Sequence, residues 1–234
     1  MSAYKEKPDH EITTKNRPIR SFVLRTGRMT AGQQRAMNEL WPLYGIEPGT
    51  DALHLDKLFP KPAPIILEIG FGNGENLAAM ANNNPECNFI GIEVHEAGMG
   101  HCLLRIAEQQ NTNVRVIRDD AVEVLRTRIL DSSLQRINLF FPDPWHKKRH
   151  HKRRIVQTDF VALLANKLVP GGLFHIATDW ENYAEHIEEV MSSCKRFKAL
   201  PEFPTDRIKT RFDARGSRLG HTNWEHAWCK RSKI

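Results

Sequence analysis

Acidic side chains stand at the ends of four successive apolar segments of this chain. Glu68 lies near the end of the first segment, Glu93 ends the second, Asp119 and Asp120 end the third, and Asp143 follows the fourth. If these segments are parallel strands, their carboxyl ends meet at the edge of the sheet where ligands bind. Any one acid could instead cap the following helix, but capping does not require an acid at every strand end. The set therefore predicts a ligand site.

Three alternating glycines, Gly70, Gly72 and Gly74, follow the first segment. Glycine lets the backbone adopt positive φ and approach a ligand closely, although such a turn also occurs as a simple tight connection. The spacing differs from the G-x-G-x-x-G turn that binds the pyrophosphate of dinucleotides, which disfavours a NAD dehydrogenase. Glu68 beside the turn would repel a pyrophosphate but attract a cationic ligand. Glu93 is placed to accept both hydroxyls of a ribose.

The third strand end offers two acids for an adenine amino group. Asp119 and Asp120 are adjacent, and the residue pattern alone does not choose between them.

A dense basic run, KKRHHKRR, extends from Lys147 to Arg154, directly after the fourth strand end. The run contains six Lys and Arg residues and no acid, so it accounts for the whole net charge of +6. A charge run is usually a solvated loop. At the lip of a ligand cleft, however, it could hold the phosphates of a polyanion. Trp145, just before the run, is the best candidate for stacking on a nucleic-acid base.

The elements expected to position these residues alternate between strands and helices. Five apolar segments, 65–70, 88–94, 113–119, 135–141 and 171–179, are predicted strands, and residues 197–203 and 226–231 could supply two more. Helical patterns occupy 75–81, 97–110, 121–129, 156–168 and 183–194, with an earlier helix that stops near residues 42–45. We expect an α/β fold, with a doubly wound, mostly parallel, seven-stranded sheet and helices on both faces.

The domain organisation expected is a flexible basic arm over residues 1–28, followed by one domain over 29–234. No segment is long and apolar enough for a membrane helix, and the first residues lack the apolar core of a signal peptide. The four cysteines form no CxxC pair, so we expect reduced thiols in a cytoplasmic protein. His146 and His150 have helical spacing, but their cationic neighbours argue against a metal site. We expect a monomer.

The motifs LEIGFGNG, FIGIEV, RDDA, FPDPWHKKRHHKRR, ATDW and TRFDARG together make the chain similar to a known family. From about Ser21 to Gly220 it resembles the bacterial tRNA (guanine-N7-)-methyltransferases. The resemblance implies a Rossmann-like methyltransferase fold, S-adenosylmethionine as cofactor and tRNA as substrate. It also implies methylation of a variable-loop guanosine, position 46 of the tRNA.

The resemblance assigns individual residues to cofactor, catalytic, substrate and RNA contacts. The cofactor site comprises Glu68, Gly70, Gly72, Gly74, Glu93, Asp120 and Asp143, and Asp143 is also the catalytic residue. Substrate contacts fall on Lys147, Asp179, Thr210, Arg211, Phe212 and Asp213. RNA contacts fall on Arg149, His150, His151, Lys152, Arg153 and Arg154. Asp213 stands where many members of the family have glutamate, which shortens its reach by one methylene.

The chemistry expected of Asp143 is electrostatic. Guanine N7 is a lone-pair acceptor with no proton to remove, so its methylation needs alignment of donor and acceptor rather than a general base. The methylated purine gains positive charge, which a nearby carboxylate stabilises. Two other function classes stay open from the sequence: a methyltransferase acting on another RNA or on protein, and a non-catalytic RNA-binding protein.

Overall fold

One mixed sheet organises the molecule. The computed structural model describes residues 20–23, 29–202, 206–210, 213 and 222–232. Its strands are β1 (Gly45–Ile46), β2 (Ile65–Ile69), β3 (Asn88–Ile92), β4 (Val114–Ile117), β5 (Leu134–Phe140), β6 (Leu168–Thr178), β7 (Phe197–Ala199) and β8 (Trp224–Lys230). Its helices are α1 (Ala31–Tyr44), α2 (Glu75–Asn83), α3 (Glu96–Glu108), α4 (Ala121–Thr127), α5 (Thr158–Lys167) and α6 (Glu181–Ser193). Short 3-10 helices occupy η1 (Leu55–Lys57) and η2 (Lys148–Arg153).

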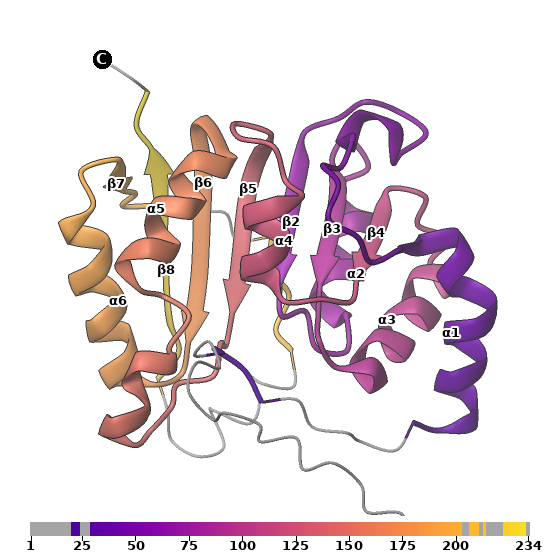
Figure 1. Ribbon diagram of the computed structural model, residues 1–234, viewed down its shortest axis with the longest axis horizontal. Coiled ribbons are helices and arrows are strands. Elements are labelled where there is room, and N and C mark those ends of the chain that lie inside the picture. Colours follow the sequence, from indigo (N-terminus) through magenta and orange to yellow (C-terminus); the bar gives the residue numbers. More distant parts are fainter. Residues whose placement is uncertain (1–19, 24–28, 203–205, 211–212, 214–221, 233–234) are drawn as a thin grey trace, which may run out of the picture.

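The strand order is β1-β4-β3-β2-β5-β6-β8-β7, and only β8 pairs antiparallel with its neighbours. The chain moves outward from β2 through β3 to β4, then returns to place β5 on the other side of β2. The β2–β5 boundary is therefore the switch point, where an open α/β sheet leaves a crevice beyond its strand ends. The carboxyl ends of β2 to β6 lie at the lower edge of Figure 1.

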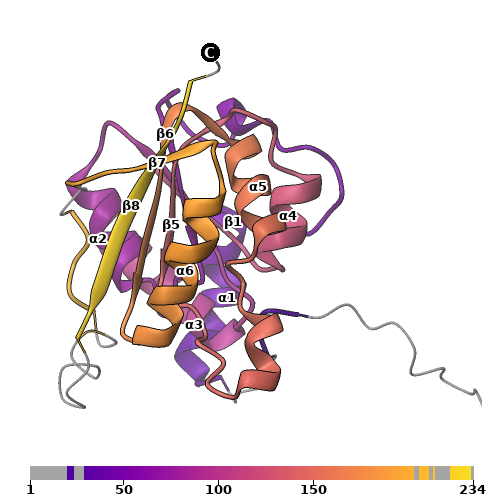
Figure 2. The same ribbon diagram turned by 90° about the vertical axis from the view of Figure 1, so that its left-hand side faces the viewer.

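Helices cover the two faces of the sheet (Figure 2). Alternation of side chains along the strands builds one core on each face. Ile65, Leu67 and Ile69 of β2 belong to the core beneath α4, α5 and α6. Ile66 belongs to the second core, beneath α1, α2 and α3. All five residues of β2 are buried, which explains why this strand reads as an unbroken apolar run with one acid, Glu68.

On one face of the sheet, beyond α2, the buried side chains are polar instead of apolar. Ile137 of β5 and Phe174 of β6 point into the core beneath α5 and α6. Their neighbours Arg136, Asn138 and His175 point to the opposite face and are also buried. There, Asp206 and Arg207 lie against the sheet through hydrogen bonds to Arg136 and to Glu225 of β8. This half of the sheet thus has a polar layer on one of its two faces.

The α/β fold, the mostly parallel sheet and the helices on both faces are confirmed. In the described part of the chain the sheet has eight strands instead of seven, because Gly45 and Ile46 pair with β4 directly after α1. Helix α1 continues through Pro42 to Tyr44, and a capping box between Thr30 and Gln33 starts it. Most of the basic run, from Lys148 to Arg153, forms η2. Among the described residues, no helix could cross a membrane.

Gly74, the third glycine of the turn, allows the turn to pack closely against α3. Gly74 has φ +72°, and a Cβ there would overlap Cys102 of α3. Gly171 has a similar φ, +78°, with nothing near an added Cβ. Gly74→Ala should therefore lower the free energy of unfolding by about 2–4 kcal/mol, through backbone strain plus overpacking, and Gly171→Ala by only about 1–2 kcal/mol. Urea unfolding measures both; equal losses would show that the contact with Cys102 does not matter.

Candidate functional site

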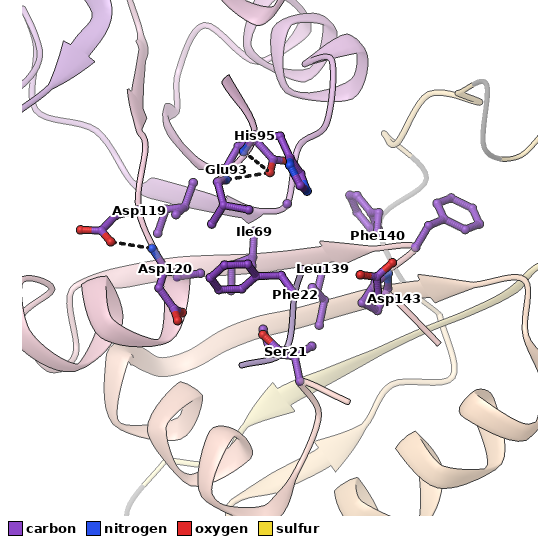
Figure 3. A pocket seen from close by; sticks show the side chains of 17 residues that line it. Ser21, Phe22, Ile69, Glu93, His95, Asp119, Asp120, Leu139, Phe140 and Asp143 are labelled. Carbon is purple, nitrogen blue, oxygen red and sulfur yellow. Dashed lines mark hydrogen bonds between the residues drawn. The ribbon is translucent and has the colours of Figure 1, made fainter. Parts of the chain in front are cut away.

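A cavity of about 170 Å³ opens at the switch point, beyond the carboxyl ends of β2 to β5 (Figure 3). Four of the residues predicted for the cofactor line it: Gly70, Glu93, Asp120 and Asp143. Its other walls include the apolar side chains of Ile69, Ile92, Ala121, Leu139, Phe140 and Ile155. The cavity thus offers apolar walls for a flat group and acidic acceptors at its rim.

Glu93 is the most firmly held of these acids. Its Oε2 accepts from the backbone N–H of Gly72 at 2.9 Å, and its Oε1 accepts from Val94 at 2.7 Å and His95 at 3.0 Å. Three backbone donors fix the orientation of the carboxylate, and Oε2, which accepts only one of the three hydrogen bonds, keeps a further lone pair. The middle glycine of the turn therefore positions Glu93, which the sequence pattern did not indicate.

Asp120 and Asp119 both line the cavity but differ in their contacts. Asp120 is the N-cap of α4, where its Oδ1 accepts from the N–H of Val122 at 2.9 Å. Asp119 Oδ1 accepts from the N–H of Asp120 at 2.7 Å. The capping role considered for Asp120 is real, and Asp120 lines the cavity as well.

Glu68 faces a smaller neighbouring cavity of about 40 Å³, which shares Gly70, Phe140 and Phe141 with the first. The side chain is buried, and its Oε2 accepts from Nδ2 of Asn76 at 2.8 Å. Burial raises the pKa of this carboxyl from 4.5 to about 7, against the lowering effect of the Asn76 hydrogen bond. A cation in this cavity would recover the ionised form.

Asp143 stands at the mouth of the cavity, on an exposed turn after β5. The turn is unusual, because Phe141 and Trp145 have φ of 51° and 50° in the left-handed region. Non-glycine residues rarely adopt this conformation. It turns the chain sharply on both sides of Asp143 and places the carboxylate beside Phe140 at the rim (Figure 3).

The N-terminal segment also reaches the cavity. Ser21 and Phe22, from the arm predicted over residues 1–28, line the cavity beside Asp120 and Leu139 (Figure 3). Trp145 Nε1 donates to Ser21 O at 3.1 Å, and the Arg153 guanidinium donates to Arg20 O at 3.1 Å and Phe22 O at 3.2 Å. Sequence reasoning did not assign Ser21 and Phe22 to the site. Residues 1–19 and 24–28 lie outside the described residues.

Trp145 and Arg153 contact each other as well as residues 20–22. The Arg153 guanidinium lies 4.0 Å from the centroid of the Trp145 ring. The aromatic face that we expected to stack on a base is thus covered by a cation from η2.

The basic run presents Lys147, Lys148, Arg149 and Lys152 as exposed side chains. His150 and His151 have pKa values below the ordinary 6.5, because of desolvation and of cations that include Arg149 and Arg154. Their rings are neutral at pH 7, so the lysines and arginines supply the charge.

Arg154 differs from the rest of the run because it is buried, at 2% exposure. Its guanidinium donates to Pro144 O, Asn182 O and Asn182 Oδ1, and lies 4.7 Å from the centroid of the Tyr183 ring. The prediction that Arg154 contacts RNA does not fit this geometry, since the charge is enclosed by protein groups. Arg154 instead ties the turn after β5 to α6.

The residues predicted to contact the substrate are only partly described. Thr210 lines the small cavity with Glu68, whereas Asp213 is buried and accepts from Thr210 N at 2.8 Å and from the Arg207 guanidinium at 2.9 Å. Arg211 and Phe212 lie outside the described residues. Asp179 lines a separate open pocket with Trp180 and Trp224, so the structure does not bring it into the first cavity.

These features fit a cationic cofactor that carries an adenosine. Glu93 offers fixed acceptors for ribose hydroxyls, Asp119 and Asp120 offer acceptors for an amino group, and Ile92 and Leu139 can enclose a flat ring. Glu68 and Asp143 would face the cationic end. Among the described residues, no group of three or more His, Cys, Asp or Glu side chains could hold a metal ion.

Structural similarity supports the fold. The 16S rRNA methyltransferase KamB matches with a TM-score of 0.52 at 11% identity, over 76% of this chain and 91% of its own. The aminoglycoside resistance methyltransferase NpmB1 matches with a TM-score of 0.50, also at 11% identity, over 75% of this chain and 90% of its own. Both likenesses show the Rossmann-like methyltransferase architecture.

Sequence similarity is closer. A family described as "Putative methyltransferase" matches residues 62–226. The tRNA (guanine-N(7)-)-methyltransferase of Shewanella woodyi is 54% identical over 89% of this chain and 90% of its own length. The enzyme of the same name from Alcanivorax borkumensis is 50% identical over 96% of both chains. The chain, with its acids gathered at the switch point, is therefore a methyltransferase and belongs to the tRNA (guanine-N(7)-)-methyltransferase family.

Proposed function

We propose that this protein transfers the methyl group of S-adenosylmethionine to N7 of a guanine in tRNA, at guanosine 46 of the variable loop. The observation that carries the proposal is one cavity, lined by Gly70, Glu93, Asp120 and Asp143, together with the basic helix η2, whose Arg153 holds the segment 20–22 that also lines the cavity. A tRNA substrate implies activity in the cytoplasm, and one complete cavity in one chain is consistent with a monomer.

The cofactor would lie along the switch point, and it supplies the reaction with an activated methyl group on a sulfonium. Glu93 would accept the ribose hydroxyls, since three backbone N–H groups hold its carboxylate in place. Asp120 would accept from the adenine amino group with the oxygen that does not cap α4. Glu68, in the adjoining cavity, would face the cationic amino-acid end of the cofactor.

Asp143 is the catalytic residue of this proposal. Its position at the mouth lets it accept from N1–H and the amino group of an entering guanine, which turns N7 toward the methyl donor. The carboxylate also stabilises the positive charge that the base gains. It abstracts no proton, because N7 has none.

The exposed side chains of η2 are proposed to bind tRNA phosphates. Lys148, Arg149 and Lys152 project from η2, and Lys147 precedes it. Arg153 acts indirectly, through Trp145 and the backbone of residues 20–22. The acids of the cavity and the cations of η2 thus serve different ligands, a cationic cofactor and a polyanionic RNA.

The test of this function is to incubate the protein with methyl-labelled S-adenosylmethionine and unmodified tRNA, then separate the nucleosides. Label in N7-methylguanosine supports the proposal, and label in another nucleoside would indicate another RNA reaction. A transcript in which guanosine 46 is replaced by adenosine should take up no label. Undiminished labelling of that transcript would refute the assignment of the position.

Asp143→Ala tests the catalytic assignment. We expect the single-turnover rate to fall by roughly 10²- to 10³-fold, the cost of losing one preorganised electrostatic group, while the affinity for cofactor changes much less. Asp159→Ala removes an exposed acid from the first turn of α5 and is the matched control. Full turnover by Asp143→Ala, or a pH profile with an essential base near neutrality, would rule out this role.

Glu68 predicts a pH dependence of both cofactor binding and stability. Since its pKa in the free protein is about 7, a cationic cofactor must displace a proton below that pH. Affinity should rise with pH by at most about tenfold per unit and level off above pH 7. The folded protein holds this proton between pH 4.5 and 7 whereas the unfolded chain releases it, so this contribution to stability falls as pH rises through that window.

Glu68→Gln should consequently bind cofactor weakly and without this pH dependence. It should also gain stability relative to the unmodified protein at pH 8 and lose that advantage near pH 5. Calorimetric titration and thermal unfolding measure the two effects, with Glu86→Gln as an exposed control. A variant that keeps the pH dependence of binding would show that another group titrates.

Salt dependence tests the RNA face. Replacing Lys147, Lys148, Arg149 and Lys152 together by Gln should weaken tRNA binding. It should also reduce the slope of log affinity against log salt by about three, because each of four phosphate contacts contributes about 0.7 to 0.9. Filter binding between about 50 and 200 mM salt, a range over which salt weakens phosphate contacts strongly, measures the affinity and its slope. An unchanged slope would remove these residues from the interface.

A further inference from the structure

The segment that leads to Thr210 is anchored to the sheet by one buried cation, Arg207. The Arg207 side chain is 7% exposed. Its guanidinium lies 5.4 Å from the centroids of both the Phe140 and Phe141 rings. Phe140 ends β5 and Phe141 follows it, three and two residues before Asp143. Arg207 therefore packs directly beneath the turn that carries the proposed catalytic carboxylate.

Two carboxylates bind this guanidinium from different parts of the chain. Asp213 binds it through both oxygens, each at 2.9 Å, and Glu225 of β8 accepts two hydrogen bonds at 2.9 and 3.2 Å. Burial acts against these charges, but the hydrogen bonds outweigh it. They raise the pKa of Arg207 and lower the pKa of Asp213 and, together with His175, that of Glu225 to about 2. All three groups stay charged at any working pH.

Asp213 closes the segment around Arg207. Besides the guanidinium, it accepts from Thr210 N at 2.8 Å, Thr210 Oγ1 at 3.1 Å and Asn223 Nδ2 at 3.0 Å. The N–H of Ile208 donates to Asn76 Oδ1 at 3.1 Å, and the amide of Asn76 donates in turn to the buried acid of β2. The position of Thr210 at the small cavity is thus defined from two sides.

Glu225 extends this anchor into the polar layer of the sheet. Its Oε1 lies 2.8 Å from His175 Nε2, and His175 Nδ1 lies 2.7 Å from Arg136 Nη2. Since the arginine can only donate, Nδ1 is the acceptor and Nε2 carries the proton that Glu225 accepts. Arg136 also binds Asp206 at 2.9 and 3.0 Å, immediately before Arg207. Asp206 and Arg207 therefore bind side chains of β5 and β8, and His175 of β6 connects these two partners.

We propose that Arg207 is a positioning residue for methyl transfer: its guanidinium fixes the Thr210 segment against the end of β5 that carries Asp143. The inference rests on the proposed function, because it takes Asp143 and Thr210 as parts of the reacting site. Arginine is required because its planar fork makes four hydrogen bonds to two carboxylates while it lies against two rings. Lysine would keep the charge but not this geometry.

The decisive variant is Arg207→Lys, compared with Arg128→Lys. Arg128 is also buried, but it lies at the far end of α4 and holds the backbone of Glu47 and Asp51. Both variants should lose comparable thermal stability. We expect only Arg207→Lys to lower the single-turnover rate, by roughly 10- to 100-fold as for a small misplacement of reacting groups, with much smaller changes in cofactor and tRNA affinity.

Chemical rescue provides a second readout. Guanidinium ion at millimolar concentration should restore part of the rate of Arg207→Ala and none of that of Arg128→Ala. A rate for Arg207→Lys within about twofold of the control would overturn the inference, as would equal rescue of both alanine variants. The unmodified protein in the same assay distinguishes a failure of this inference from a failure of the proposed function. If the unmodified protein does not label N7-methylguanosine, the proposed function is wrong, whatever the rates of the Arg207 variants.

Discussion

The structure depends on one electrostatic constraint, the meeting of several carboxylates at the edge where β2, β3, β4 and β5 end. Each acid is accommodated differently. Glu93 is held by three backbone N–H groups, and Asp120 caps α4. Glu68 is buried with a pKa of about 7, and Asp143 stands in solvent at the mouth. Glu68 thus retains a proton below about pH 7, and a cation bound beside it would displace that proton.

The exposed positive charges belong to a different element, the 3-10 helix η2. The exposed cations of η2 follow Asp143 within a few residues of the chain, after the turn in which Phe141 and Trp145 have positive φ. The buried arginines of this region, Arg154 and Arg207, serve the protein itself. Net charge alone therefore misrepresents the molecule. Its acids and its exposed bases are suited to two different ligands, and its enclosed guanidinium groups join the elements that hold them.

Much of this could be predicted from the sequence, because parallel strands alternate with helices and place their ends at one edge. The apolar segments around Ile66, Ile90 and Ile137 predicted the strands, and the acids after them predicted the cavity. Burial could not be predicted in the same way: Arg154 looks like any other base of KKRHHKRR until Tyr183 and Asn182 enclose it. The contact of Phe22 with the cavity and the ion pairs of Arg207 depend on residues far apart in the chain, which periodicity does not connect.

A structure of this protein with S-adenosylmethionine bound would show directly where the cofactor lies. We expect the ribose hydroxyls on the Glu93 carboxylate, the adenine between Ile92 and Leu139 with its amino group at Asp120, and the sulfonium methyl facing Asp143. A cofactor seated away from the β2–β5 switch point, or one whose methyl group points away from Asp143, would contradict this expectation.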